Sequence, residues 1–278
     1  MIIKDKERIY DCLMNLVDNQ LDISSLLKRI EASKIPGIYE VEFIGFSLAN
    51  GYIKSTAVYL IEPISLGPYE QTKRRLEIYN YYLNLFSNSL AKHVFSYNEC
   101  PFSIDPSFKS SDSDFTLRLE PQVDFNRINP FRYLEYLIEF AFPKNMSIFK
   151  TAKNIGVPAR IAVEIDTQCF AGRKIRLYYY DNNRDENEVF SGVSINEKGL
   201  LSTIKHYYGI FGNIDKHQNL LKKNINQILF NKIVEFANSY EKHLLSLRYF
   251  ACEKSDYGVD SKLYFRNDLP FYDKINIK

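Results

Sequence analysis

The sequence predicts a single soluble, intracellular α/β domain, whose strands form antiparallel hairpins with one apolar face and one face of tyrosine and charge. Its 278 residues lie within the range of one domain. The composition, 45% hydrophobic and 25% charged, is ordinary for a globular protein that buries a large core without disulfides or metals. Pairs of short alternating segments are separated by helical periodicities, which differs from the βαβ pattern of a parallel sheet.

Charge and cysteine content exclude several classes of protein. The chain has 36 Lys and Arg and 34 Asp and Glu, which gives a net charge of +2. This excess of positive charge is too small for a protein that binds nucleic acid mainly through its phosphates. The four cysteines lie far apart without a CxxC pair, so we expect no structural zinc site and a reduced, cytoplasmic setting. No segment has the apolar core of a signal peptide or the roughly 20 apolar residues of a membrane span. We therefore expect a cytoplasmic monomer with neither membrane nor nucleic acid as partner.

Helical periodicity marks several segments. Between residues 69 and 92, apolar residues such as Leu76, Leu83 and Leu90 fall on one stripe. The segments expected to be helical are 5–33 in two pieces, 69–92, 130–142, 198–211 and 216–245.

Four hairpins alternate with these helices. The first turns at Asn50-Gly51, a strong signal for a tight β-turn. The hairpins recur at intervals of roughly 55 to 90 residues, which indicates repetition of one supersecondary unit. The expected arms are 38–47 with 52–62, 93–104 with 114–122, 159–166 with 173–181, and 246–253 with 260–267.

Side chains alternate strictly between the two faces of the third hairpin, as strand geometry requires. Ile161, Val163, Ile175 and Leu177 share an apolar face. The opposite face of its two strands carries charge and tyrosine: Arg160, Glu164, Asp166, Lys174, Arg176, Tyr178 and Tyr180.

The first and fourth hairpins show the same division. In the fourth, Leu263 and Phe265 lie opposite Lys262, Tyr264 and Arg266. In the first, we expect one face with Tyr39, Val41 and Phe43, and the other with Glu40 and Glu42.

Two architectures fit these faces. One is a sheet with helices on its apolar face and water on its polar face. The other is a closed sheet, because a sheet of about eight or more strands tends to curl, with helices outside and tyrosine inside. The triplets Arg176-x-Tyr178 and Lys262-x-Tyr264 favour the second, because a solvated face has no need for tyrosine two residues after a cation.

A polar interior of this kind has the parts of prenyl transfer. Converging lysines and arginines bind a diphosphate. Tyrosine faces stabilise a cation, and a carboxylate accepts the proton that the acceptor loses.

The segments RKIRLYYY (173–180) and DSKLYFR (260–266), with the repeated units around them, resemble the ABBA-type prenyltransferases. Among these the chain looks most like the cyanobactin-type peptide prenyltransferases. The resemblance implies an antiparallel β-barrel of repeated α-β-β-α units with helices on the outside, formed by residues 1–278 as one domain. The family usually has five repeats, so a fifth hairpin is expected in 186–196 or in the C-terminal FYDKINIK, or is absent.

The resemblance also assigns roles to residues. Glu40 or Glu42 would be the base, with Glu40 slightly favoured. Two alternatives are that Glu40 pairs with Lys54 and that Arg176 pairs with Glu164. The residues implied to bind the diphosphate are Lys54, Arg118, Lys174, Arg176, Lys262 and Arg266, with Arg118 alternatively a solvated strand residue. Those implied to shield the allylic cation are Tyr178, Tyr180 and Tyr264.

By the same resemblance, the chain would transfer a dimethylallyl or geranyl group from its diphosphate to a side chain of a peptide, such as a cyclic natural product. The alternatives are a free small aromatic acceptor, a barrel that binds a small anionic or apolar ligand without catalysis, or an interaction module. No DDxxD motif is present, so we expect no metal ligands in the protein and any Mg²⁺ to bind through the diphosphate.

Overall fold

The computed structural model describes residues 2–3, 14, 23–33, 38–61, 102–110, 115–121, 125, 129–142, 145–166, 172–180, 188–238, 245–255 and 258–267. The expected helix at 69–92, most of the first piece of 5–33, and the segment 93–101 lie outside these residues.

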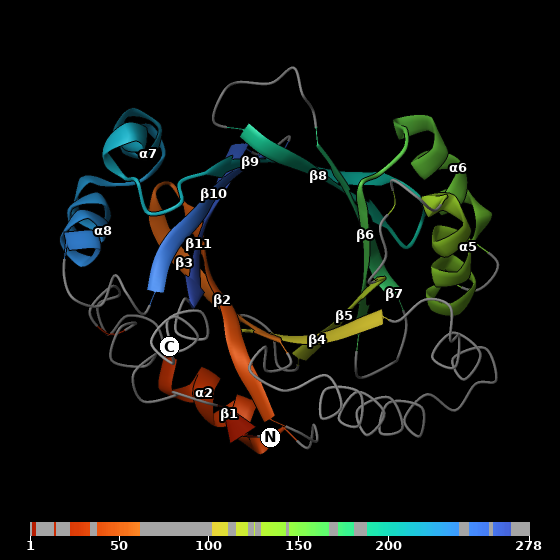
Figure 1. Ribbon diagram of the computed structural model, residues 1–278, viewed down its shortest axis with the longest axis horizontal. Coiled ribbons are helices and arrows are strands. Elements are labelled where there is room, and N and C mark those ends of the chain that lie inside the picture. The colour runs from red at the N-terminus through yellow and green to blue at the C-terminus, as the bar shows by residue number, and fades with distance from the viewer. Residues whose placement is uncertain are drawn as a thin grey trace, which may run out of the picture.

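Within the described residues, ten antiparallel strands close into a barrel, which confirms the expected fold class (Figure 1). The order around the barrel is β2-β11-β10-β9-β8-β7-β6-β5-β4-β3, and β3 pairs with β2 to complete it. The strands are β2 (Ile38–Ala49), β3 (Tyr52–Ile61), β4 (Phe102–Lys109), β5 (Phe115–Pro121), β6 (Arg160–Asp166), β7 (Gly172–Tyr179), β8 (Glu188–Asn196), β9 (Leu201–Gly209), β10 (Leu245–Ser255) and β11 (Gly258–Asn267).

The first hairpin forms where its turn residues predict. Asn50 and Gly51 have φ of 51° and 77°, the left-handed values that a tight hairpin turn of this kind needs. The amide of Asn226 donates to the carbonyl of Gly51 at 3.1 Å, so the turn is also held by the segment between α7 (Gln218–Asn224) and α8 (Gln227–Asn238). The short β1 (Ile2–Ile3) pairs with β2 in parallel.

The fifth hairpin is β8–β9, and the prediction of a helix over 198–211 is wrong. The turn between the two strands contains Gly199 at φ 78°. In β9 the buried Lys205, Tyr207 and Gly209 alternate with the half-buried His206 and Tyr208, and this period of two in burial belongs to a strand and not to a helix. The helix expected over 216–245 is also interrupted, since the backbone at Ile225 is extended and separates α7 from α8.

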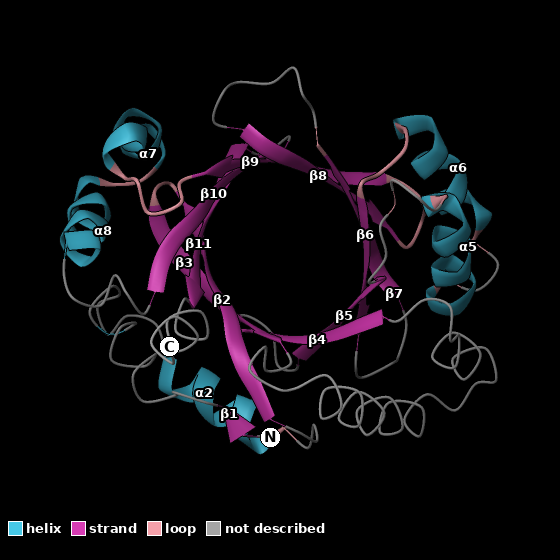
Figure 2. Ribbon diagram, in the orientation of Figure 1, coloured by secondary structure: helices cyan, strands magenta, loops and turns pink. Residues whose placement is uncertain are grey.

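Helices cover the outside of the barrel (Figure 2). α5 (Pro130–Ala141) was expected, whereas α6 (Met146–Ile155) was not; both lie beside β6 and β7. Leu134 and Ile138 of α5 are buried in one cluster with Ile161, Ile175 and Leu177 of the strands. Burial of each such side chain contributes roughly 1.5–3 kcal/mol. The apolar faces of the hairpins therefore point outward, towards the helices.

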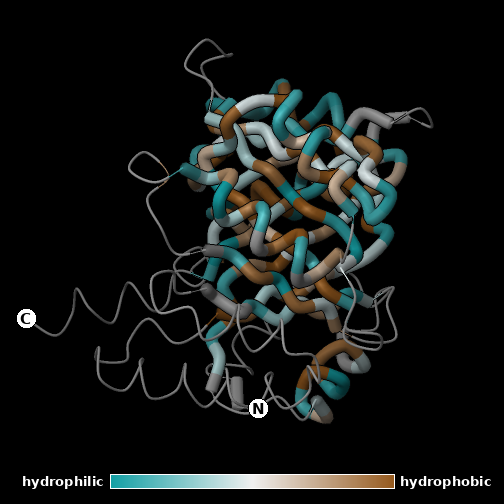
Figure 3. The backbone as a smooth tube through the Cα atoms, turned by 90° about the vertical axis from the view of Figure 1, so that its right-hand side faces the viewer, coloured by the Kyte–Doolittle hydropathy of each residue, from teal (hydrophilic) through white to brown (hydrophobic). Residues whose placement is uncertain are grey.

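The polar faces consequently line the inside of the barrel. Hydrophobic and hydrophilic residues alternate along the strands (Figure 3).

The first helix described, α2 (Ile23–Ala32), packs Leu26, Leu27 and Ile30 into the outer core. In the described part of the chain, no helix combines the length and the apolar character needed to cross a membrane.

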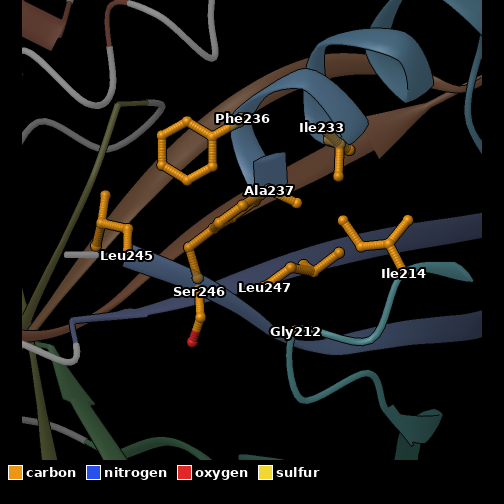
Figure 4. Close-up of a pocket in the computed structure, with 9 residues that line it drawn as sticks. Gly212, Ile214, Ile233, Phe236, Ala237, Leu245, Ser246 and Leu247 are labelled. Atoms are coloured by element: carbon orange, nitrogen blue, oxygen red, sulfur yellow. The ribbon is translucent and has the colours of Figure 1, made fainter. Parts of the chain in front are cut away.

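An apolar cavity of about 210 Å³ lies in the outer layer (Figure 4). Ile233, Phe236 and Ala237 of α8 form one side, and Leu245 and Leu247 of β10 form another. These residues belong to the outer core, so this cavity is separate from the polar inner face.

Candidate functional site

The inner face carries a cluster of cations at the end of the barrel where β7 begins. Neighbouring strands β4, β6, β7, β9, β10 and β11 supply its members through the strand register. We call this group the cationic end: Lys109, Lys174, Arg176, Lys205 and Lys262, with the carboxylates Glu164 and Glu253.

Part of this charge is paired. Arg176 Nη2 lies 2.5 Å from Glu164 Oε1, and Lys174 Nζ lies 3.2 Å from Glu164 Oε2. Burial alone would raise the pKa of Glu164, but the charges of Arg176 and Lys174 hold it well below its usual range. The pair predicted as an alternative for Arg176 therefore forms, and Glu164 stays ionised at the centre of the cluster.

The remaining cations are in excess. Lys205 Nζ lies 2.5 Å from Glu253 Oε2, yet burial and the charge of Arg176 lower the pKa of Lys205 to about 8. Within the described residues, no hydrogen bond or ion pair engages Lys262. Burial, Lys205, Arg176 and Lys109 lower the pKa of Lys262 well below its ordinary value. The lowered pKa values of these lysines follow from burial and from positive charge that the nearby carboxylates do not balance.

A belt of tyrosines lies next to the cationic end, on β3, β7, β9 and β11. Ring centroids lie 6.2 Å apart for Tyr59 and Tyr264, 6.0 Å for Tyr264 and Tyr207, and 6.4 Å for Tyr207 and Tyr178. These four residues, the tyrosine belt, are joined by Phe190, whose ring stacks on Tyr207 at 4.3 Å. Burial raises the pKa of Tyr59, Tyr207 and Tyr264, so their phenols stay neutral and their faces can support a cation.

Two glycines leave room for these rings. A Cβ at Gly192 would lie 3.1 Å from Tyr207 and 3.3 Å from Tyr178, and one at Gly45 would lie 3.1 Å from Tyr59. Because each glycine sits on a strand beside the tyrosines, the rings can lie against the barrel wall.

Arginines and carboxylates form the opposite end of the inner face, which we call the arginine end. Arg118 Nη2 lies 2.5 Å from Glu120 Oε2, and Arg160 Nη2 lies 2.6 Å from Glu120 Oε1. Both guanidinium groups lie over the ring of Tyr178, at 5.7 Å and 5.5 Å from its centroid. Arg118 is therefore an ordered part of the interior and not a solvated strand residue.

Glu42 also belongs to the arginine end. The β2–β3 register shifts between Val41 and Phe43, so Glu42 occupies a bulge. Burial raises the pKa of Glu42, against the opposing charges of Arg118 and Arg160. The bulge also turns Phe43 to the inner face, 6.1 Å from the ring of Tyr249, so its expected place on the apolar face with Tyr39 is wrong. The extra residue reverses the alternation, which a strict period of two cannot anticipate.

Three predicted residues lie elsewhere than expected. Lys54 is exposed beside the β2–β3 turn, at the opposite end of that hairpin from Glu40, so these two side chains do not pair. Tyr180 follows the last residue of β7 and is 58% exposed. Arg266 lies on the inner face but at the arginine end, where its charge acts on Glu42. Glu40 is buried near the start of β2, paired with Ile61 in the ladder.

The structure also adds residues that the sequence reasoning missed. Lys205-x-Tyr207 repeats the basic-x-Tyr triplet, but it falls in the segment that was expected to be helical. Lys109 and Tyr59 had no such signal, and only the closure of the barrel brings them to the site.

The similarities of this chain to known proteins are similarities of fold. No protein-family model matches the sequence, and no curated protein matches it. Among solved structures, 5-dimethylallyltryptophan synthase from Streptomyces coelicolor superimposes with a TM-score of 0.54 at 8% identity, over 95% of this chain and 91% of that one.

The apo form of the prenyltransferase PriB gives a TM-score of 0.53 at 10% identity, over 83% of this chain and 80% of that one. The complex of PriB with L-tryptophan and dimethylallyl thiolodiphosphate gives the same values. At such identities the likeness concerns the fold, and this chain has the closed, helix-ringed antiparallel barrel of the ABBA-type prenyltransferases.

Proposed function

We propose that this protein transfers an isoprenyl group from its diphosphate to a nucleophilic acceptor. One observation carries the proposal: on β7, β9 and β11 a cation is followed two residues later by a tyrosine of the belt. Two residues along a strand span about 7 Å. The pairs are Arg176 with Tyr178, Lys205 with Tyr207, and Lys262 with Tyr264.

This spacing suits the two halves of an allylic diphosphate. The diphosphate, held at the cationic end, departs with the electron pair of the C–O bond, and the lysines and arginine stabilise its negative charge. The allylic carbon then carries positive charge beside the tyrosine belt, whose π faces stabilise it. The acceptor's nucleophilic atom forms the new bond to that carbon and loses a proton.

We assign the proton acceptor to Glu42 in preference to Glu40. Glu42 is half-buried among the arginines, and its raised pKa makes it a better proton acceptor than a carboxylate of ordinary pKa. It lies at the arginine end, so the acceptor would enter there, on the far side of the tyrosine belt from the diphosphate.

The fold neighbours support a prenyl diphosphate as donor, since PriB is bound to a thiolo analogue of dimethylallyl diphosphate. They also favour a small aromatic acceptor, since PriB is bound to L-tryptophan in the same structure. Our first candidate remains a side chain of a peptide, as in cyanobactin-type enzymes. The described residues include no group of three or more His, Cys, Asp and Glu placed to hold a metal, so Mg²⁺ would bind through the diphosphate.

The test is incubation with dimethylallyl or geranyl diphosphate together with L-tryptophan or a mixed panel of linear and cyclic peptides. We expect a mass increase of one prenyl group on an acceptor, with one diphosphate released for each product. A binding protein would retain the donor without modifying any acceptor. An interaction module would not bind the donor at all, and either result would overturn the proposal.

A further inference from the structure

A second, smaller cavity lies outside the barrel at the arginine end. Its volume is about 150 Å³. It is lined by Val157, Pro158 and Ala159 from the connection between α6 and β6, by Tyr179 and Tyr180 at the end of β7, and by Phe125, which lies between β5 and α5. The amide of Ala159 donates to the carbonyl of Tyr178 at 2.8 Å, which holds this connection beside β7.

The wall of this cavity combines apolar exposure with an unsatisfied hydroxyl. Val157 is 68% exposed and Tyr180 is 58% exposed. Single exposed apolar residues are common, but these two line one concave site. The ring of Tyr179 completes this wall, while its hydroxyl is buried without a hydrogen-bond partner among the described residues.

The cavity adjoins the inner face of the barrel. The ring of Tyr180 lies 6.1 Å from that of Phe190, which stacks on Tyr207 of the tyrosine belt. Arg160, directly after Ala159, reaches over Tyr178 of the same belt. An acceptor atom beside the belt would therefore have the rest of its molecule close to this cavity.

We propose that this cavity is an acceptor subsite for the apolar side chain of a residue that neighbours the modified residue in a peptide. The inference rests on the proposed function and names its acceptor class. Pockets for whole ligands usually measure about 300–1,000 Å³, so a cavity of about 150 Å³, half the lower limit, suits one aliphatic side chain. Because the cavity lies on the far side of Tyr180 from the tyrosine belt, it can hold a residue that flanks the modified one, which a free amino acid held inside the barrel lacks.

The experiment compares two acceptors with the same nucleophile, L-tryptophan and tryptophan-containing peptides with a flanking leucine. Val157→Asp places a charge in the cavity. Because Val157 is exposed, we expect the variant to fold normally. We expect KM for the peptide to rise about tenfold, with kcat/KM for L-tryptophan and KM for the donor unchanged. The matched control is Leu200→Asp. Leu200 is 60% exposed and lies beside the β8–β9 turn, at the cationic end.

If Val157→Asp changed KM equally for both acceptors, or left KM for the peptide unchanged, the proposed subsite would be wrong. A parent protein that prenylates L-tryptophan and rejects every peptide would also overturn it, while the proposed function would stand. If the parent protein binds the donor but modifies no acceptor, the proposed function itself is wrong. Titration of the peptide against the parent and against Val157→Asp then decides whether the cavity binds an apolar side chain.

Discussion

Lys205 and Lys262 lie close enough on the inner face for the charge of Lys205 to lower the pKa of Lys262. Lys205 has a carboxylate partner, Glu253 at 2.5 Å, whereas no ion pair engages Lys262 among the described residues. Folding therefore places two like charges together in a buried setting, which costs free energy unless an anion joins them.

Lys262→Met tests this arrangement. The change removes a buried, unpaired ammonium and keeps a similar side-chain volume, so we expect the midpoint of thermal unfolding to stay the same or rise. Donor binding should weaken by about ten- to a hundredfold, the worth of one charge-assisted contact to phosphate. Differential scanning fluorimetry and calorimetric titration with dimethylallyl diphosphate measure the two quantities.

Arg176→Met is the contrasting variant. It leaves Glu164 with only Lys174 as partner, and breaking a buried ion pair costs roughly 3–5 kcal/mol, so this variant should lose stability as well as donor affinity. Unchanged donor affinity in both variants would place the diphosphate elsewhere.

Donor affinity should depend on pH through Lys205. Because its pKa is lowered to about 8, the attraction of Lys205 for the diphosphate is fully present below that pH and is lost above it. The stability of the free protein should change in the opposite direction. Between pH 8 and the unfolded pKa of about 10.4 the unfolded chain holds more protons, so the contribution of Lys205 to stability rises with pH.

Calorimetric titrations above about pH 7.5, where the second ionisation of phosphate is complete, measure this dependence. Lys205→Arg is the control, since a guanidinium stays charged throughout the range and should flatten the profile. A profile that is equally steep in Lys205→Arg would assign the proton to Lys262 instead.

Glu42→Gln tests the proposed base. The amide keeps the shape of the carboxylate but accepts no proton, so turnover should fall by roughly a hundredfold or more. Donor binding should survive, because Glu42 lies at the end of the barrel opposite the lysines. Single-turnover measurements of product formation separate the two effects. Glu40→Gln is the matched control, and a slow Glu40→Gln beside a normal Glu42→Gln would transfer the role to Glu40.

Gly192→Ala tests the seating of the tyrosine belt. The added Cβ would approach Tyr207 to 3.1 Å and Tyr178 to 3.3 Å, so one or both rings must move a few tenths of an ångström into the interior. Since shielding of the allylic cation depends on ring position, we expect a larger share of donor hydrolysis by water relative to transfer. Product analysis by mass spectrometry gives this ratio. A normal ratio, with the variant's fold intact by circular dichroism, would show that the belt tolerates the shift.

The repeating unit of the fold could be predicted from local pattern. Alternation in the third hairpin placed Ile175 and Leu177 outside and Arg176 and Tyr178 inside, because side chains on a strand alternate wherever the strand is regular. The turn at Asn50-Gly51 was equally local, since its two residues adopt the φ values that these residue types tolerate.

The same reasoning failed where one extra residue or a competing periodicity intervened. The bulge at Glu42 reversed the alternation and brought Phe43 inside. The segment of β9 was short and rich in apolar residues, for which helix and strand periods are hard to tell apart. Reading it as a helix concealed Lys205 and Tyr207, one of the three cation and tyrosine pairs on the inner face.

By itself the sequence determined which residue types face the interior: cations two residues before tyrosines, on strands whose other face is apolar. Only the tertiary structure decided how these residues are arranged around the barrel. Closure pairs β11 with β2, and it brings Tyr59 beside Tyr264 and Lys109 near Lys262. Position along a strand sets the end of the barrel at which a side chain lies, and this separates Lys54 from Glu40 and Arg266 from Lys262. Strand register, which depends on contacts between distant segments, therefore fixed the lysines at one end and Glu42 at the other.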